Sequence, residues 1–412
     1  MINRNNKKGF TIVELVIVIA VIAILAAVLI PTFSGIINKA NQSADVSAVT
    51  QMNKVLAGND YKDISEVAKA LTDNGFNADD TLVPVSKDHA YYWFPEYNMV
   101  ILVDESTWKL VAPISNTELV NAFNATTKES NAFVNLKVTG AKTDVSDSAS
   151  LDTALSAGQN ITLTATPEKI TTSNAKYTSD GRPAGMLVPE DAVVAIDLGE
   201  QTLEAEPGAV ALAIKGEAVI TNGTISTRSI VVEAGGKLTI GEGVKVVASA
   251  TDGGQCIRNL GGVVTINAGT FEATNGDTPT NPSGEPSCIY NEGYMVVNGG
   301  TFEADSGAYA FVCSGGTLII NYATVNASRG AISATGASHL IINDGIFTSN
   351  MKSSAYALYF DADTVNATLE INGGTFNNAA GGYDVYIKGG KEVKIKAGLL
   401  SDPTDSYYYN AN

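Results

Sequence analysis

Three cysteines and two histidines are all that this chain of 412 residues offers for disulfide bonds or zinc binding. Neither residue type occurs in a C-x-x-C or H-E-x-x-H spacing, so the sequence predicts neither a disulfide framework nor a metal centre. Charged residues are scarce too, at 17% against roughly 25% in average domains. Basic residues are the scarcer kind: 26 Lys+Arg against 43 Asp+Glu give a net charge of −17. This charge disfavours binding to nucleic acid or to anionic headgroups.

Glycine is abundant by contrast, with 39 residues, and serine, threonine and asparagine are plentiful. At roughly 100 to 200 residues per domain, the length predicts two to four structural units. A low content of charge together with many turn-forming residues is typical of an all-β body. We therefore expect a mainly β protein.

The amino terminus carries the longest apolar run. It extends over Phe10–Ile30 with Glu14 as its only charge, and it follows the basic residues Arg4, Lys7 and Lys8. At about 1.5 Å per residue, such a helix measures about 31 Å, which is enough to cross a bilayer. Basic residues beside a span stay in the cytoplasm, so the rest of the chain is expected outside it.

Three interpretations fit this run: a secretory signal, a plain membrane anchor, or a specialised segment whose acid has a function. A carboxylate among lipid tails costs about 2.5–3.5 kcal/mol, and neither of the first two explains Glu14. The apolar run also continues to Pro31, longer than the core of an ordinary signal, although the small residues of Ala23–Ala27 keep a signal cleavage site possible. The third interpretation predicts a partner for Glu14.

The stretch K-K-G-F-T-I-V-E-L, Lys7–Leu15, resembles the type IV prepilin family, which includes the pseudopilins of type II secretion. The resemblance covers about the first 31 residues. It implies that a prepilin peptidase cleaves between Gly9 and Phe10 and that the new amine of Phe10 is methylated. It also implies that Glu14 neutralises the terminal amine of a neighbouring subunit during filament assembly. Two opposite charges that are each costly in hydrocarbon can offset one another when helices pack.

Composition and pattern divide the chain further. Helical spacing of apolar residues continues beyond Pro31 to Leu56, and Gly58-Asn59 ends it. The expected parts are a leader (1–9), a hydrophobic pilin helix (10–57), a small α+β head (58–138), a linker (139–150), a parallel β-helix (151–400) and a tail (401–412).

The head segment contains an aromatic cluster, which comprises Tyr91, Tyr92, Trp93, Phe94 and Tyr97. A helix is expected before it over Ile64–Leu71, and strands after it over Met99–Val103 and Trp108–Val111. The cluster could stack on carbohydrate, but aromatic residues at strand spacing are more often core, which we favour. His89 is expected at the surface.

The second half repeats one phrase: T-I-N-A-G-T-F from Thr265, V-V-N-G-G-T-F from Val296, I-I-N-D-G-I-F from Ile341 and E-I-N-G-G-T-F from Glu370. Such self-similarity predicts stacked coils. The segment resembles right-handed parallel β-helix proteins. Nine matching positions, and thus nine coils, follow: Asp197, Thr221, Gly241, Asn267, Asn298, Asn321, Asn343, Asn372 and Lys396. Asparagines at these positions could form a hydrogen-bonded ladder. An antiparallel sandwich is the alternative.

Two further features belong to this expected solenoid. A short helix over Leu151–Gly158 would cap its first coil, followed by a strand over Ile161–Thr166. Cys256 and Cys288 occupy matching positions in adjacent copies. A disulfide is possible at that spacing, but stacked buried side chains are the favoured interpretation, and Cys313 has no evident partner.

A carbohydrate-active solenoid would need clustered carboxylates or a basic residue on one face. The candidates are Asp252 with Arg258, and Asp361 with Asp363, and the latter pair could also hold calcium. Isolated charges on a charge-poor solenoid are more often solvated loop residues. We therefore expect no catalytic residue, no cofactor and no metal.

The sequence therefore predicts a minor or tip subunit of a type IV pilus or type II secretion-like filament. Its expected partners are the prepilin peptidase, other pilin subunits contacted through the helix, the membrane before assembly, and a surface or glycan ligand, but not nucleic acid. It is expected as a single-pass membrane protein with a cytoplasmic N-terminus, and later at the cell surface or in a pilus. The alternative is a membrane-tethered β-helix enzyme that degrades polysaccharide.

Overall fold

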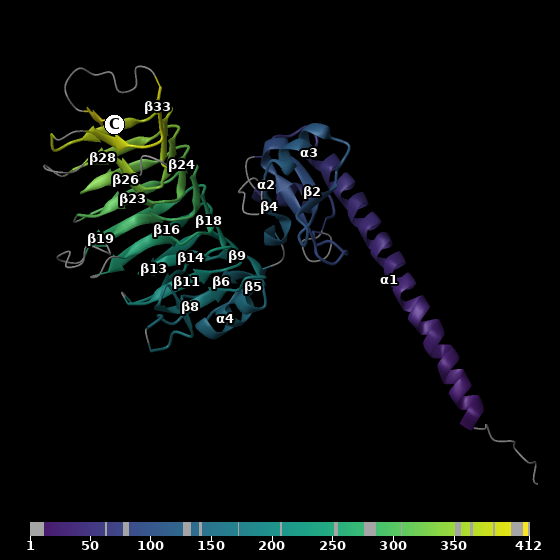
Figure 1. Cartoon of the computed structure of the whole chain (residues 1–412). Helices are drawn as coiled ribbons and strands as arrows, with labels where there is room; N and C mark the ends of the chain where they lie inside the picture. Colours follow the sequence, from purple (N-terminus) through teal and green to yellow (C-terminus); the bar gives the residue numbers. More distant parts are fainter. Residues whose placement is uncertain are drawn as a thin grey trace, which may run out of the picture. The chain divides into compact units, whose positions relative to one another are not determined.

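A computed structural model describes residues 12–61, 64–76, 82–126, 133–139, 142–171, 173–206, 208–250, 254–275, 286–305, 307–350, 356–362, 366–381, 384–396 and 407–410. The chain divides into two compact units, Met1–Ala125 and Thr126–Asn412. The first contains the long helix and a small α+β head, and the second contains a β-solenoid (Figure 1). The predicted mainly β class is confirmed.

The first unit begins with the long helix α1, which runs through Pro31. Gly58 follows the end of this helix and has a φ of 87°. Glycine suits this position because residues with a Cβ rarely adopt a left-handed backbone conformation. The α-helices of this unit are α1 (Ile12–Leu56), α2 (Ile64–Asp73) and α3 (Thr117–Asn124), and its strands are β1 (His89–Phe94), β2 (Met99–Asp104) and β3 (Lys109–Ala112), with a 3-10 turn η1 (Pro95–Tyr97). Strands β1, β2 and β3 pair antiparallel in that order.

Two polar side chains attach the end of α1 to the head. The Asn53 side-chain amide donates to the Val100 carbonyl at 2.8 Å and accepts from the Val100 N–H at 2.7 Å. It therefore pairs with the backbone of this residue as a neighbouring strand would. Asp45, only 1% exposed, accepts from the backbone N–H of Val85 and Ser86 and from the Tyr91 hydroxyl. Burial, and then the Asp45 charge, raise the pKa of Tyr91. These contacts fix the helix end in one register on the sheet.

Four of the five residues in the aromatic cluster of the head are core, whereas Tyr97 is half-buried. Tyr91, Tyr92, Trp93 and Phe94 are each at most 2% exposed, as the favoured interpretation had it. Strand β1 therefore buries both of its faces. His89, expected at the surface, is half-buried, and its Nδ1 lies 2.8 Å from the Lys87 carbonyl oxygen.

Three parallel sheets form the solenoid of the second unit. Sheet 1 contains, in spatial order, β5 (Lys142–Val145), β6 (Asn160–Leu163), β9 (Val193–Asp197), β12 (Glu217–Thr221), β15 (Lys237–Ile240), β18 (Val263–Ile266), β21 (Tyr294–Val297), β24 (Thr317–Ile320), β27 (His339–Ile342), β30 (Thr368–Ile371) and β33 (Glu392–Ile395). Sheet 2 contains β10 (Thr202–Glu204), β13 (Gly223–Thr227), β16 (Val244–Ala250), β19 (Thr270–Asn275), β22 (Thr301–Ala304), β25 (Thr324–Ala327), β28 (Ile346–Ser349) and β31 (Thr375–Asn378).

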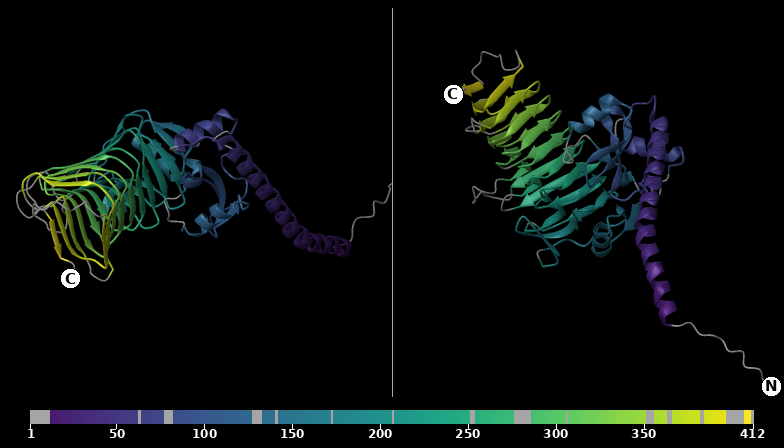
Figure 2. Two further views of the ribbon diagram at one scale, coloured as in Figure 1. Left: turned by 90° about the horizontal axis from the view of Figure 1, so that it is seen from above. Right: turned by 45° about the vertical axis from the view of Figure 1, so that its right-hand side comes forward.

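Sheet 3 begins with the only antiparallel pair among the described solenoid strands, β7 (Tyr177–Ser179) with β8 (Arg182–Val188). It continues with β11 (Val210–Ile214), β14 (Ile230–Val232), β17 (Gln255–Asn259), β20 (Ser287–Asn291), β23 (Tyr309–Ser314), β26 (Gly330–Gly336), β29 (Leu358–Ala362), β32 (Val385–Gly389) and β34 (Tyr407–Asn410). Short elements β4 (Val134–Asn135) and η2 (Leu136–Thr139) precede the solenoid. Each complete coil, from the one that begins with β9 to the one that begins with β30, contributes one strand to each sheet, and the strands of every sheet stack in sequence order from teal to yellow (Figure 2). This parallel stacking rules out the sandwich.

The repeated phrase has a direct structural meaning. Its apolar residues end a strand of sheet 1, its asparagine follows that strand, and its phenylalanine points into the core from sheet 2. The glycine two residues before this phenylalanine has a positive φ in every copy, for example 127° at Gly300, where a Cβ would lie 3.1 Å from the Gly269 carbonyl oxygen. Phe302, 0% exposed, stacks on Phe271 with ring centroids 4.8 Å apart. The phrase therefore specifies the corner between two sheets.

The predicted coils agree with the strands of sheet 1, since the nine matching positions end or directly follow β9 to β33. Sheet 2, by contrast, has only eight strands among the described residues. The solenoid therefore has about eight turns, one fewer than the sequence suggested.

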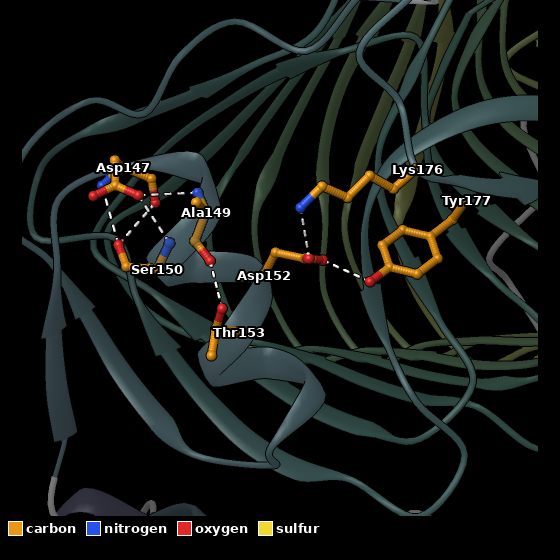
Figure 3. A network of polar contacts seen from close by, with 7 residues as sticks. All are labelled: Asp147, Ala149, Ser150, Asp152, Thr153, Lys176 and Tyr177. Atoms are coloured by element: carbon orange, nitrogen blue, oxygen red, sulfur yellow. Dashed lines mark hydrogen bonds and ion pairs between the residues drawn. The ribbon is translucent and has the colours of Figure 1, made fainter.

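A helix covers the first coil, as expected. α4 (Ser148–Ser156) buries Leu151, Ala154 and Leu155 in the solenoid core. The Asp147 carboxylate accepts from the backbone N–H of Ala149 and Ser150, and Figure 3 shows this N-cap. Because the Asp147 N–H donates in return to the Ser150 hydroxyl, the two residues form a capping box that satisfies the start of the helix.

One face of α4 is anchored further along the chain. Asp152 accepts from the Lys176 ammonium at 2.9 Å and from the Tyr177 hydroxyl at 2.6 Å, as Figure 3 shows. These bonds raise the pKa of both Lys176 and Tyr177, since each proton is held by the same carboxylate. The cap is thus tied to β7.

The segment 139–150 differs from the expected linker. It contains β5, which pairs with β6 in sheet 1, and the first residues of α4. Its small polar residues suggested a linker, but Val145 is only 3% exposed and packs in the solenoid core. The boundary between the two units lies earlier, between Ala125 and Thr126.

Candidate functional site

The predicted processing site is at the start of the chain. Gly9 and Phe10 lie outside the described residues. Glu14 lies in the first turns of α1, and its side chain is also outside the described part. Within this helix, the described side chains of Val16 and Ile19 are each 57% exposed. Apolar side chains at helical spacing suit packing against lipid or another helix.

The same pattern continues where the helix leaves its apolar run. Ile36 and Ile37 are 58% and 56% exposed, whereas Val49, Met52 and Leu56 are buried at the other end. One part of α1 therefore packs on the head and the other projects apolar side chains. In the part of the chain that the structure describes, no helix has the length and hydropathy of a membrane span.

Comparison with known proteins concerns the same region. Residues 4–30 match the family described as the prokaryotic N-terminal methylation motif. The amino terminus is thus that of a type IV pilin-like protein, and the predicted resemblance to prepilins is confirmed. The chain is 60% identical over 38 residues to the type IV wide pilus major component PilA4 of Thermus thermophilus. This match covers 9% of the chain and 29% of that relative. No solved structure matches the chain.

The predicted asparagine ladder is present on the solenoid. Each Nδ2–H donates to the Oδ1 of the preceding coil, with distances of 2.9 Å (Asn298 to Asn267), 2.7 Å (Asn321 to Asn298), 2.7 Å (Asn343 to Asn321) and 2.9 Å (Asn372 to Asn343). The ladder uses one donor and one acceptor of each inner amide, whose chemistry provides two of each. These hydrogen bonds lie at the surface, so this edge presents a regular row of amides.

A second ladder, which sequence reasoning missed, lies inside the solenoid. Asn259 donates to the Oδ1 of Asn291 at 2.8 Å, and both side chains are 0% exposed. Asn291 in turn donates to the Thr317 carbonyl at 2.9 Å. The signal for it is a second, shorter repeat, C-I-R-N-L-G from Cys256 and C-I-Y-N-E-G from Cys288, whose asparagines are in register between β17 and β20. This ladder fixes the turn between sheets 3 and 1.

The three cysteines are free and buried. Cys256 and Cys288 are stacked core side chains, as favoured, and the possible disulfide is absent from these described residues. Burial, and then the neighbouring Cys256, raise the pKa of the Cys288 thiol. Burial also raises the pKa of Cys313, whose thiol donates to the Gly316 carbonyl. A raised pKa makes the Cys288 and Cys313 thiols poor nucleophiles.

The candidate catalytic pairs find other partners. Asp252 lies outside the described residues, while Arg258 forms a 2.8 Å ion pair with Asp180 and lies over the ring of Tyr290 at 4.6 Å. Sequence reasoning missed Asp180, although Asp180-Gly181 is a typical hairpin dipeptide, with φ values of 49° and 69°.

The second pair is similar. Asp363 lies outside the described residues, and Asp361 is 3.4 Å from the Lys388 ammonium and accepts from the Tyr359 hydroxyl at 3.0 Å. Burial, and then the Asp361 hydrogen bond, raise the pKa of Tyr359. Among the described residues, no group of three or more His, Cys, Asp or Glu could hold a metal ion. Both described candidates thus belong to surface ion pairs.

Proposed function

We propose that this chain is a pilin-like subunit of a type IV pilus or type II secretion-like filament, inserted in the membrane by the apolar part of α1 and cleaved between Gly9 and Phe10. The observation that carries this proposal is the methylation motif at residues 4–30, which includes the first part of α1. The exposed apolar side chains of α1 support it, because they suit a lipid or helical environment.

Glu14 is the residue on which assembly depends in this proposal. A carboxylate in a lipid-exposed helix is costly, and a terminal ammonium on a neighbouring subunit offsets that cost. The charge of Glu14 therefore costs more free energy in a lone membrane-inserted subunit than in the filament. This difference favours association of the helices.

Processing and assembly are tested separately. Coexpression with a prepilin peptidase should remove nine residues, which intact-mass measurement detects; cleavage near Ala27 would contradict the proposal. Glu14→Ala should leave membrane insertion unchanged and reduce incorporation into filaments. Glu96→Ala is the matched control, since Glu96 is an exposed residue of the head. Equal incorporation of both variants would argue against an assembly role for Glu14.

In this proposal the solenoid binds a surface or glycan and so provides adhesion. The chain is then a minor subunit of the filament or the subunit at its tip. The second unit is the larger part of the chain, Thr126–Asn412, and so large an attachment on every subunit would crowd a filament. A ratio of this chain to other pilins near one in purified filaments would contradict the minor role.

We also propose that the solenoid is not an enzyme, in contrast to a tethered polysaccharide-degrading enzyme. Arg258 and Asp361 support this, because ion pairs occupy both. Turnover of polysaccharide that is lost on substitution of either residue would favour the enzyme instead.

A further inference from the structure

A row of five asparagines follows the corner between sheets 1 and 2. These side chains form the exposed ladder, which comprises Asn267, Asn298, Asn321, Asn343 and Asn372. In the described part of the chain, the side-chain amides of the three inner asparagines bond only to their neighbours in this row. Each inner amide therefore retains one N–H donor and one acceptor site on its carbonyl oxygen for a ligand.

The ladder also fixes the direction of these remaining groups. Because each Nδ2 donates to the preceding coil, every amide has the same orientation along the row. An isolated surface asparagine rotates and loses this freedom when it binds a ligand, which costs free energy. A row whose amides are already held avoids part of that cost. The ladder is thus a set of oriented hydrogen-bonding groups as well as a link between coils.

Threonines form a second row at the start of the sheet 2 strands. Thr270, Thr301 and Thr324 are the first residues of β19, β22 and β25, and they are in register. They are half-buried and the residue after each is buried in the core, so these threonines lie on the outer face of the sheet. Two residues separate the rows in each coil, and in the first two of these coils they are only alanine or glycine.

An exposed tyrosine accompanies the two rows. Tyr322 directly follows Asn321 and is 43% exposed. The two preceding coils have the small residues Ala268 and Gly299 at this position. Tyrosine presents a large apolar ring together with a hydroxyl, a combination that is enriched at binding surfaces. We call the asparagine row, the threonine row and Tyr322 together the amide face.

The chemistry of the amide face favours a neutral ligand that is rich in hydroxyl groups. Amides and hydroxyls both donate and accept hydrogen bonds, as sugar hydroxyls do. Asp344 is the only charged residue in its five corners, which comprise residues 267–270, 298–301, 321–324, 343–346 and 372–375. A phosphate or carboxylate polymer finds no cation in these corners and meets a chain with a net charge of −17.

The repeat of the coils restricts the shape of the ligand. Parallel strands lie about 4.8 Å apart, so the five asparagines extend over about 19 Å along the solenoid axis. A ligand that bonds to several of them must be extended and must repeat its hydroxyl groups along its length. A polysaccharide with extended linkages meets both conditions, whereas a single sugar is too short. Solenoid proteins use such continuous faces for binding.

We propose that the amide face binds a neutral polysaccharide whose chain lies along the solenoid axis. The proposal rests on the adhesive role proposed above, for which it names the ligand class and the site. The amides and the threonine hydroxyls bond to hydroxyls of successive sugars, and the ring of Tyr322 packs on the apolar face of one sugar. Because no charge takes part, added salt leaves the affinity unchanged.

The test uses the purified full chain in a detergent without a sugar headgroup. It is titrated with neutral β-1,4-linked hexasaccharides of glucose, mannose and N-acetylglucosamine. We expect at least one hexasaccharide to bind, and the corresponding disaccharide to bind at least about tenfold more weakly, because it reaches fewer coils. Binding of none of the three, or equal affinity for hexasaccharide and disaccharide, overturns the proposal.

Two substitutions locate the site. Asn298→Ala removes one amide of the row and should weaken hexasaccharide binding at least about threefold, the effect of a lost neutral hydrogen bond. Its matched control is Asn350→Ala, since Asn350 also donates to an asparagine of the preceding coil, at 2.6 Å, but follows the opposite end of the sheet 2 strands.

Tyr322→Ala removes the aromatic ring and should weaken binding at least about fivefold. Its matched control is Tyr294→Ala, since Tyr294 is 38% exposed at the start of β21, whereas the amide face follows the ends of the sheet 1 strands. Both controls should change the affinity less than about twofold, as surface substitutions away from specific contacts do.

Two further measurements separate recognition from folding. Thermal unfolding of each variant shows whether the solenoid is intact, and Tyr322→Phe keeps the ring, so it should retain the affinity within about twofold. The proposal is overturned by equal losses in the site variants and their controls, by tighter binding of polygalacturonate, or by an affinity that falls steeply with salt, since the last two indicate a charged ligand.

The adhesive role is measured independently on assembled filaments. Filaments that bind no surface although the purified chain binds the hexasaccharide would refute that role and retain the site. Filaments that adhere equally well with Tyr322→Ala, when this variant binds the hexasaccharide more weakly, would separate adhesion from the amide face and overturn the inference.

Discussion

Asn291 offers the sharpest test of how the coils are held together. Its buried side chain accepts from Asn259 at 2.8 Å and donates to the Thr317 carbonyl at 2.9 Å and the Gly293 carbonyl at 3.2 Å, with a longer contact to the Cys313 sulfur at 3.8 Å. Each contributes roughly 0.5–1.5 kcal/mol net, so Asn291→Ala should cost about 3 kcal/mol in local stability. Asn259 keeps its bond to the Gly262 carbonyl, which limits the loss.

The control is Asn321→Ala in the exposed ladder. It also removes two bonds of 2.7 Å, but water replaces them at the surface, so a change within about 0.5 kcal/mol is expected. Solenoids open coil by coil, and a single unfolding midpoint can hide a local effect. Amide hydrogen exchange in β20 and β24 is therefore the appropriate assay. An Asn291 variant that opens no more easily than the Asn321 variant would refute the idea that the buried ladder carries the stability.

Three further outcomes follow from burial and capping. Cys256, Cys288 and Cys313 should resist iodoacetamide in the native protein and react completely after unfolding, as mass spectrometry would show, and rapid native labelling would contradict their burial. The pKa of Asp147 is lowered from 3.8, mainly by the hydrogen bond from the Ser150 N–H and then by the Ser150 hydroxyl. The Asp147 carboxylate therefore stabilises the fold above pH 3.8, and this contribution is lost as the pH falls through the lower pKa of the folded state. Asp147→Asn keeps an N-cap without a titrating group and should flatten the acid side of the unfolding temperature measured by circular dichroism; an unchanged pH profile would exclude Asp147 as its source. Phe302→Ala removes a ring between two buried rings and should destabilise by about 3–5 kcal/mol in denaturant titration, and a loss below about 1 kcal/mol would show that the core adapts there.

The repeated coils of the solenoid could be predicted from the sequence. The corner phrase recurs with the same residue types, and each type has its own physical role. The apolar residues end a strand, Asn298 bonds to the neighbouring coil, and Gly300 takes a backbone conformation that other residues rarely adopt. Local patterns also predicted α2 and the end of α1, because Gly58 and Gly75 terminate them with positive φ values.

What escaped prediction depends on contacts between distant residues. The polar segment around Val145 looked like a linker, but a single buried valine and strand pairing decide its structure. α3 was missed, although Asn116 caps it by accepting from two backbone N–H groups. The partner of Arg258 could not be predicted either, because only the stacking of coils brings Asp180 within 2.8 Å of it.

The unbroken register of the coils has an evolutionary consequence. Excision of the residues from Asn298 to Ile320 would remove β22, β23 and β24, one strand from each sheet, and would join Val297 to Asn321. Asn321 would then stand beside Asn267, and Val325 would follow Phe271 in the interior. Gain or loss of whole modules by unequal recombination can thus lengthen or shorten this protein without redesigning either neighbour.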